Sequence, residues 1–192
     1  FEYQRVLGKN LSLDELRLGY DTVLIALGCS QPRKLGIAGE DLPGVVYALP
    51  FLKSVRFGQS QALGRKVVVI GGGDVAVDCA QTARRLGAEE VVVISLEDDS
   101  SLPAHPNVVN GAKAEGIVFR GAWGPQAIRG QGDRLDGVQL KKCVSVFDAA
   151  ANFRPVYDVC QTDFETADCV IVAIGQSADL SCLADCGIAR AG

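Results

Sequence analysis

Two short apolar runs without polar alternation stand out along the chain, Val67–Ile70 and Val91–Ile94. Continuous runs of this length are typical of parallel strands that are covered on both faces. Between them, apolar residues recur at three- and four-residue steps, and Gly87 then follows where a helix C-cap belongs. The apolar positions are Val75, Cys79, Ala83 and Leu86. The pattern predicts a βαβ unit, whose connection is right-handed in nearly all proteins.

The N-terminal part of the chain shows a weaker pattern. Phe1–Val6 alternates like a short strand, the Ser-x-x-Glu spacing of Ser12–Glu15 predicts a helix capping box, and Thr22–Ala26 reads as a buried strand. Glycines and prolines interrupt residues 32–45, which predicts a connector with a domain boundary near its end. Val45–Val55 predicts a short helical approach to the βαβ unit.

The C-terminal part changes in character. A short helix is expected from Pro106 to Glu115, and strand-like segments divided by glycines then run from residue 117 to 160 and predict a β-meander. Cys169–Ile174 is another buried strand. The predicted fold class is therefore α/β, a Rossmann-like parallel sheet with a β-meander.

Composition narrows the function classes. The chain has 192 residues, a net charge of −4 and a pI near 5.0, without a basic run that would neutralise a row of phosphates. The sequence contains neither an apolar run of membrane-spanning length nor a secretory signal pattern. We therefore expect a cytoplasmic protein without a membrane or nucleic-acid partner. Because methionine is missing even at position 1, we also expect an excised piece of a longer protein.

The titratable side chains predict neither a metal site nor a catalytic residue. The seven cysteines form an odd number and include no C-x-x-C pair, which argues against a disulfide framework, structural zinc or a redox dithiol. Cys182 and Cys186, four residues apart, would face one another on a helix. His105, between Pro103 and Pro106, is expected to order a loop rather than to catalyse.

The glycine turn after Ile70 carries the chemistry. Gly71-x-Gly73-x-x-Ala76 is the G-x-G-x-x-A form of the dinucleotide fingerprint, with Gly72, Asp74 and Val75 between its fixed positions. The first glycine makes the turn, the second lets the backbone approach a pyrophosphate, and the small third residue allows close helix packing. The alternative is a tight turn kept for packing. We expect Asp74 to accept hydrogen bonds from its own helix's amides.

The end of the second strand bears on which dinucleotide is bound. Ser95, Leu96 and Glu97 open an acidic stretch that continues through Asp98 and Asp99 and contains no Lys or Arg. A ribose 2′-hydroxyl favours a carboxylate there, whereas a 2′-phosphate favours Arg or Lys. The stretch favours NADH over NADPH, and at least two of these acids fit a solvated loop equally well.

Longer segments resemble one family. VVVIGGGDVAVDCAQTARRLGAEEVVV, VIVAIGQSAD and IAGEDLPGVVYALPFL resemble the NAD(P)H domain of the glutamate synthase small-subunit family, which includes the flavin portion of dihydropyrimidine dehydrogenase. The resemblance covers nearly the whole chain and is weakest across residues 120–165. Members differ from this chain in an Arg-Arg pair where Leu96-Glu97 stands, and in a Thr where Val75 stands.

The resemblance implies a divided chain. Residues 1–45 would be an FAD-domain segment with the crossover, residues 46–180 the NAD(P)H domain, and residues 181–192 a return toward the FAD domain. Gly71 to Ala76 would hold the pyrophosphate, the residues after Ile94 the ribose, and Ala173, Ile174 and Gly175 would lie along the cofactor. Gly28 would belong to the FAD side. The family's FAD fingerprint and clustered cysteines are missing, so FAD is expected in the full-length protein only.

The implied function is hydride transfer from NADH or NADPH to FAD and on to iron–sulfur centres or a partner subunit. The partners implied are the rest of the FAD domain and an iron–sulfur domain or larger catalytic subunit. A thioredoxin-reductase-like enzyme is disfavoured because the redox dithiol is missing. A non-catalytic nucleotide-binding or interaction module stays open as the alternative.

Overall fold

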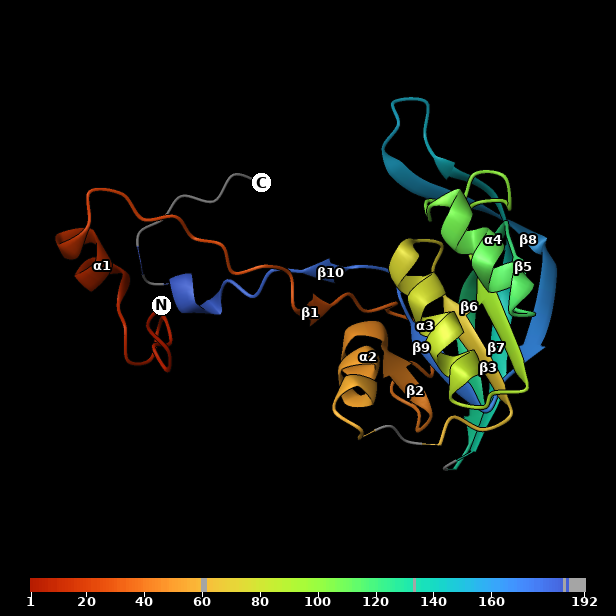
Figure 1. Cartoon of the computed structure of the whole chain (residues 1–192). Helices are drawn as coiled ribbons and strands as arrows, with labels where there is room; N and C mark the ends of the chain where they lie inside the picture. The colour runs from red at the N-terminus through yellow and green to blue at the C-terminus, as the bar shows by residue number, and fades with distance from the viewer. Residues whose placement is uncertain (60–61, 133, 185, 187–192) are drawn as a thin grey trace. The chain divides into compact units, whose positions relative to one another are not determined.

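The computed structural model describes residues 1–59, 62–132, 134–184 and 186. Contacts divide the chain into two compact units, Phe1–Gln31 with Gln176–Gly192, and Pro32–Gly175. The larger unit carries the predicted βαβ unit (Figure 1).

The centre of the larger unit is a five-stranded parallel sheet in the order β2-β9-β3-β4-β5. Its strands are β2 (Val45–Tyr47), β3 (Lys66–Ile70), β4 (Glu90–Ile94), β5 (Val118–Arg120) and β9 (Cys169–Val172). From their second residues on, β3 and β4 are buried, as expected for strands covered on both faces. The parallel sheet and the βαβ unit are confirmed.

Three helices cover one face of this sheet (Figure 1). They are α2 (Ala48–Arg56), α3 (Asp74–Arg85) and α4 (Pro106–Ala114). Small residues on α3, such as Ala76 and Ala80, are fully buried against the sheet, so the helix lies close to it. The expected helical segment from Val45 is wrong in its first three residues, which form β2 because they pair with β9.

An antiparallel sheet covers the other face. It consists of β6 (Trp123–Gln131), β7 (Arg134–Phe147) and β8 (Phe153–Thr166), and its buried side chains pack against those of the parallel sheet. The meander is confirmed, but the placement of residues 117–120 in it is wrong. Val118–Arg120 pairs with β4 instead, because α4 returns the chain to the open edge of the parallel sheet.

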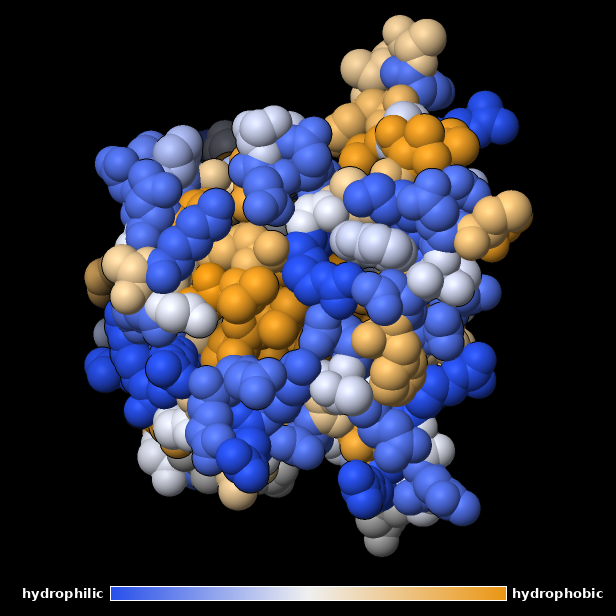
Figure 2. Space-filling view, turned by 90° about the vertical axis from the view of Figure 1, so that its right-hand side faces the viewer, coloured by the Kyte–Doolittle hydropathy of each residue, from blue (hydrophilic) through white to orange (hydrophobic). Residues whose placement is uncertain are grey.

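The hairpin between β7 and β8 extends beyond the rest of the larger unit (Figure 1). Phe147 and Phe153 meet edge to face near its tip, with ring centroids 6.1 Å apart, and both rings are more than half exposed. Figure 2 shows orange side chains on this projecting hairpin at the top of the view.

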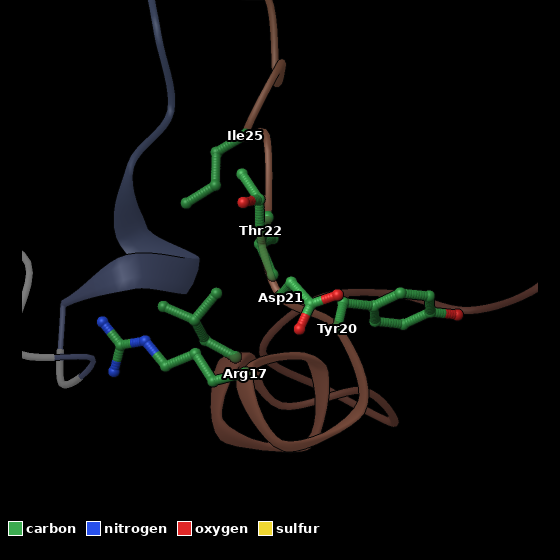
Figure 3. Close-up of a pocket in the computed structure, with 7 residues that line it drawn as sticks. Arg17, Tyr20, Asp21, Thr22 and Ile25 are labelled. Atoms are coloured by element: carbon green, nitrogen blue, oxygen red, sulfur yellow. The ribbon is translucent and has the colours of Figure 1, made fainter.

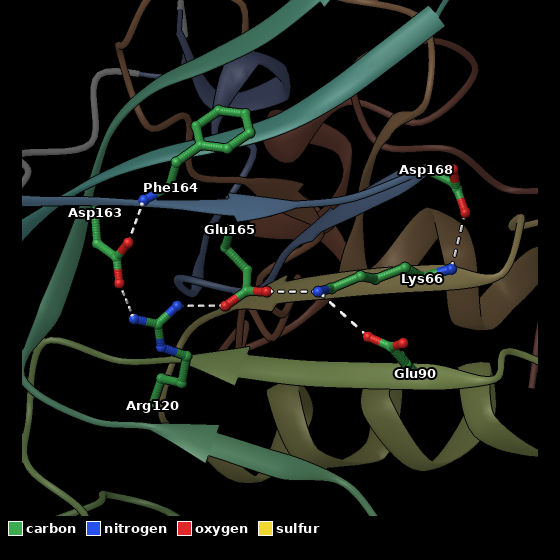
Figure 4. A network of polar contacts seen from close by, with 7 residues as sticks. All are labelled: Lys66, Glu90, Arg120, Asp163, Phe164, Glu165 and Asp168. Atoms are coloured by element: carbon green, nitrogen blue, oxygen red, sulfur yellow. Dashed lines mark hydrogen bonds and ion pairs between the residues drawn. The ribbon is translucent and has the colours of Figure 1, made fainter.

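A chain of ion pairs joins the two sheets at their margin (Figure 4). The buried carboxylate of Glu165 on β8 contacts Lys66 Nζ at 2.8 Å and also pairs with the Arg120 guanidinium. Arg120 additionally contacts Asp163 Oδ2 at 2.5 Å, and Lys66 contacts Glu90 Oε2 at 3.3 Å. Because Glu165 is buried, removing one of its cationic partners would leave its charge poorly compensated, so these ion pairs help to hold β8 against the parallel sheet.

The smaller unit contains little regular structure. The capping box is confirmed, because Ser12 Oγ accepts from Glu15 N at 3.1 Å and Glu15 Oε2 from Ser12 N at 2.7 Å, opening α1 (Leu13–Gly19). A 3₁₀ turn, η1, spans Ser181–Leu183. A two-stranded sheet forms from β1 (Gln31–Pro32) and β10 (Gln176–Ser177).

Two predicted strands of this unit are wrong. Neither Phe1–Val6 nor Thr22–Ala26 forms a strand, and Leu24 is 90% exposed. A strand requires a neighbour that exchanges backbone hydrogen bonds with it. Within the described residues no strand lies alongside either segment, so their apolar pattern has nothing to pack against.

A buried carboxylate organises the crossover that leads into β2. Glu40 is 7% exposed and accepts hydrogen bonds from Leu35 N at 2.6 Å, Gly36 N at 2.8 Å and Tyr47 Oη at 2.8 Å. Burial by itself raises the pKa of Glu40, but the three donors outweigh burial and hold this pKa below its usual range. Burial of the Tyr47 hydroxyl and the adjacent Glu40 carboxylate raise the pKa of Tyr47 to about 12.

Glu40→Gln is expected to destabilise the chain by about 2 kcal/mol at neutral pH, the usual contribution of hydrogen bonds to a charged, buried acceptor. Because the folded pKa of Glu40 is lowered, its stabilisation is present above the ordinary pKa of 4.5 and is lost as pH falls through the folded pKa. Urea unfolding at neutral and at acidic pH measures the free energy of unfolding. The difference in this free energy between wild type and variant should become smaller in acid. Asp41→Asn is the control, since the Asp41 side chain is 91% exposed; an equal loss in both variants would contradict the assignment.

Candidate functional site

The glycine turn lies where the carboxyl ends of three parallel strands meet. Gly71 N donates to Ile94 O at the end of β4, and Ala173 N donates to Ile70 O at the end of β3, each at 2.8 Å. A Cβ at Gly71, whose φ is +143°, would lie 2.3 Å from the carbonyl oxygen of Ala173. The chain runs from β3 to β4 on one side and returns as β9 on the other, so the turn occupies the topological switch point of the sheet.

The next two glycines differ in what surrounds them. A Cβ at Gly72 would lie 3.1 Å from both Glu97 Oε2 and Pro103 Cδ, so neighbouring side chains already fill the space beside this residue. A Cβ at Gly73 would meet nothing within 4 Å. Gly73 is therefore the open position of the turn, where a ligand can approach the backbone.

The amides behind Gly73 are available as donors. Gly73 is the N-cap of α3 and makes no side-chain cap hydrogen bond. Within the described residues, the backbone hydrogen bonds use neither Asp74 N nor Val75 N as a donor, whereas Ala76 N donates back to Gly73 O at 2.9 Å. Free amides at the positive end of a helix dipole form an anion-binding site. The turn thus has the backbone arrangement that a pyrophosphate requires.

Asp74 fastens a second helix to this turn. Its Oδ1 accepts from His105 N at 2.7 Å, so the expectation that it accepts from its own helix's amides is wrong, because the loop before α4 brings another donor within reach. Ala104 N also donates to Gly72 O at 3.0 Å. His105 is the N-cap of α4, where its Nδ1 accepts from Asn107 N at 3.4 Å, so it orders the loop as expected.

The loop after β4 forms hydrogen bonds on several sides. The buried Ser95 donates its hydroxyl to Glu97 O at 2.9 Å, and its own carbonyl accepts from Trp123 N at 2.9 Å. Ala122 N donates to Glu97 O at 2.8 Å. Leu96, between them, packs toward Gly124. These bonds fix the backbone of Glu97, whose carboxylate lies beside Gly72 at the edge of the turn.

The three acids of this loop have different roles. Asp98 accepts from Ser100 Oγ at 2.5 Å and Ser100 N at 2.8 Å, and these bonds lower the pKa of Asp98. Asp99 Oδ1 accepts from Gly121 N at 3.1 Å. Glu97 is half-buried, and its carboxylate makes no hydrogen bond or ion pair within the described residues. Two acids therefore shape an exposed loop, and Glu97 alone remains free to accept from a ligand.

The predicted residues after β9 lie on the other side of the turn from Glu97, because β9 and β4 flank β3. Ala173 is half-buried, Ile174 is 36% exposed, and Gly175 has a φ of +101°. Gly175 O accepts from Arg33 N at 3.1 Å, which ties this end to the crossover. Gly28 belongs to the smaller unit, and its assignment to an FAD site stays a prediction.

Two hollows lie within the smaller unit. The one in Figure 3, of about 250 Å³, is lined by seven residues between Leu13 and Ile25, among them Arg17, Tyr20 and Asp21. Cys182 and Cys186 line the other, of about 280 Å³, and Cys186 Sγ lies 3.7 Å from Cys182 O. Among the described residues, His, Cys, Asp and Glu form no group of three suited to a metal ion. The described helices include none long and apolar enough to span a membrane.

Comparison with known proteins gives consistent matches. A family model described as "Pyridine nucleotide-disulphide oxidoreductase" matches residues 1–192. The chain is 36% identical over 180 residues to the NADP(+)-dependent formate dehydrogenase subunit beta of Moorella thermoacetica, covering 92% of this chain and 26% of that protein. It is 31% identical over 188 residues to the glutamate synthase [NADPH] small chain of Escherichia coli, covering 91% of this chain and 40% of that protein.

A solved structure supports the fold. Mycobacterium tuberculosis FprA, in complex with NADPH, matches with a TM-score of 0.70 and 21% identity, over 89% of this chain and 53% of that chain. The chain spans between a quarter and two fifths of the length of the two relatives above. The resemblance to the glutamate synthase small-subunit family is confirmed.

Gly73→Ala is expected to keep the fold and lose dinucleotide affinity. The new methyl group enters open space, so the stability cost is limited to the poorer N-cap, at most about 1 kcal/mol, while the pyrophosphate loses its close approach to the backbone. Calorimetric titration should show that the affinity for NADH falls at least about tenfold, equivalent to about 1.4 kcal/mol of binding free energy. Gly111→Ala, inside α4 with only Gln81 Nε2 at 3.9 Å, is the matched control. Equal affinities in the two variants would rule out the turn as the binding site.

Asp74→Ala and Asp74→Asn are expected to differ. Asn retains an oxygen that accepts from His105 N, so it should keep α4 in place and reduce repulsion of a pyrophosphate, giving unchanged or tighter binding. Ala removes the acceptor and should weaken both thermal stability and dinucleotide affinity, by about 1 kcal/mol for the lost hydrogen bond. Melting curves with and without NADH measure both quantities. Weaker binding by Asn than by Ala would contradict a positioning role.

Proposed function

This chain belongs to the pyridine nucleotide-disulphide oxidoreductase family, and we propose that it is the nicotinamide-dinucleotide-binding portion of a flavin-dependent oxidoreductase. The observation that carries the proposal is the open Gly73 followed by the free amides of Asp74 and Val75, at the switch point of a parallel sheet. Backbone donors of this kind hold a diphosphate without a basic side chain.

The chain's own residues would bind and orient the cofactor. The start of α3 holds the pyrophosphate, Glu97 accepts from the adenosine ribose, and Ala173 to Gly175 line the opposite side, where the nicotinamide end would lie. When bound, the nicotinamide supplies the hydride, so the protein needs to fix geometry and exclude competing reactions rather than supply an acid or base. This requirement agrees with the prediction that the chain contains no catalytic side chain.

The proposed function also includes an acceptor for the hydride. We infer that it passes to FAD and then to iron–sulfur centres or a partner subunit, since one relative is named as a formate dehydrogenase subunit and another as a small chain. Residues 1–45 and 181–192 would complete an FAD domain with parts of the protein outside this chain. The highly exposed apolar side chains of Leu18 and Leu24 fit such a contact.

A cytoplasmic location is also proposed. The structure contains free cysteines at all seven positions, buried and exposed alike. Thiols are kept reduced in the cytosol and oxidise in secreted proteins.

The preference for NADH rests on the loop after β4. Glu97 is its free acceptor, and residues 95–99 contain no Lys or Arg. The two relatives carry NADP in their names, which does not support this preference. The charge at the ribose position argues for NADH because a carboxylate beside Gly72 repels a 2′-phosphate.

Titration of the folded chain with NADH and NADPH tests both the proposed dinucleotide binding and the proposed preference for NADH. NADH is expected to bind more tightly, and Glu97→Gln should reduce the NADH preference by about tenfold, because it removes the repulsion while keeping an acceptor. Asp98→Asn is the control, since that carboxylate is occupied by Ser100. Tighter binding of NADPH by wild type would overturn the preference, and no binding of either nucleotide would overturn the proposed function in favour of an interaction module.

A further inference from the structure

A basic residue lies next to the proposed ribose site although the loop itself has none. Arg120 is the last residue of β5 and stands opposite Ile94 in the sheet register. Its carbonyl oxygen accepts from Ser95 N at 3.3 Å, so its backbone adjoins the loop that carries Glu97. An arginine at such a position is the side chain expected to bind a 2′-phosphate.

The guanidinium of Arg120 is already occupied. Asp163 Oδ2 lies 2.5 Å from one terminal nitrogen, and Glu165 pairs with the other. The group also lies over the Trp123 ring, 5.6 Å from its centroid, and the side chain is only 24% exposed. Figure 4 shows both carboxylates reaching the guanidinium from β8. Both terminal nitrogens of the guanidinium therefore already pair with carboxylates, and Arg120 is not available to an anion.

The two carboxylates are not held equally. Glu165 is buried and is also fixed by Lys66 at 2.8 Å, so it belongs to the joint between the sheets. The Asp163 side chain is 47% exposed. The Arg120–Asp163 pair is partly exposed to solvent, so losing it costs less stability than losing a buried pair. Asp163 can therefore be neutralised without dismantling the network that Glu165 anchors.

We propose that Asp163, together with Glu165, determines nucleotide preference by holding Arg120 in ion pairs against β8 and so withholding it from a 2′-phosphate. The inference rests on the proposed function, since it concerns the ribose end of the same dinucleotide site. It adds a second determinant to Glu97, namely Asp163 on β8, which lies 66 positions further along the sequence. The preference for NADH thus comes from an arginine that is already paired as well as from the free carboxylate of Glu97.

The released arginine has the donors that a phosphate requires. Guanidinium presents five N–H groups in a fixed fork, so it can keep its bond to Glu165 while offering the other edge to a phosphate. Lys142 also lies over the Trp123 ring, at 5.0 Å, but as a single point charge it lacks the fork. Arg120 is therefore the residue whose release should matter.

Asp163→Asn in the full chain tests the inference. We expect the affinity for NADPH to rise about tenfold while that for NADH changes less than about twofold, because only NADPH carries the group that a freed arginine binds. Calorimetry gives both dissociation constants. Fluorescence of Trp123, the single tryptophan, gives an independent reading beside the ribose site.

Asp158→Asn is the matched control. Asp158 lies on the same strand, and its replacement changes the charge equally, but its carboxylate accepts from Cys160 N at 2.9 Å and Gln161 Nε2 at 2.8 Å rather than from Arg120. Any general effect of removing one negative charge appears in both variants. If Asp163→Asn and Asp158→Asn change NADPH affinity equally, the inference is overturned.

A second variant connects the effect to Arg120. Adding Arg120→Gln to Asp163→Asn should abolish the gain in NADPH affinity, with urea unfolding used to verify that the double variant is folded. A gain that persists without Arg120 would also overturn the inference. Failure of the proposed function is distinguishable, because wild type would then bind neither nucleotide, whereas failure of this inference leaves NADH binding intact.

Discussion

The close approach of Gly71 to the carbonyl of Ala173 is the constraint on which the candidate site depends. A side chain at residue 71 would lie 2.3 Å from that oxygen, so the ends of β3 and β9 can adjoin only across a glycine. That contact directs the chain out of the sheet and into α3 with its first amides unpaired. The hydrophobic burial of β3, β4 and β9 holds the strand ends in position, and the glycine lets them be so close.

Charge is arranged around this turn by tertiary contacts rather than by the turn itself. Asp74 accepts from the backbone of His105, Asp98 accepts from Ser100 in its own loop, and Asp99 accepts from Gly121 after β5. Glu97 is thereby left as the free acceptor. On the far side of that loop, carboxylates from β8 neutralise the nearest arginine. Under the proposed function, these side chains surround the backbone amides of the turn and would discriminate between NADH and NADPH.

The buried strands and the glycine turn were predictable because each signal is local. An unbroken apolar run, a helical repeat of apolar residues and a G-x-G-x-x-A spacing act over fewer than about thirty residues, the span of a βαβ unit. The predicted strands at Phe1–Val6 and Thr22–Ala26 failed for the complementary reason. Their apolar residues indicate a strand only where a neighbouring strand exists, and within the described residues none lies beside them.

The sequence by itself determined the parallel sheet, the helix that follows Gly73, and the acidic character of the loop after β4, because these follow from periodicity and residue type. Only the tertiary structure decided that Val118–Arg120 joins the parallel sheet, that Asp74 bonds to His105, and that Asp163 and Glu165 occupy Arg120. Each of these depends on which of several chemically equivalent partners lies within hydrogen-bonding distance. Distances between residues far apart in sequence are set by packing of the whole unit, which no local pattern encodes.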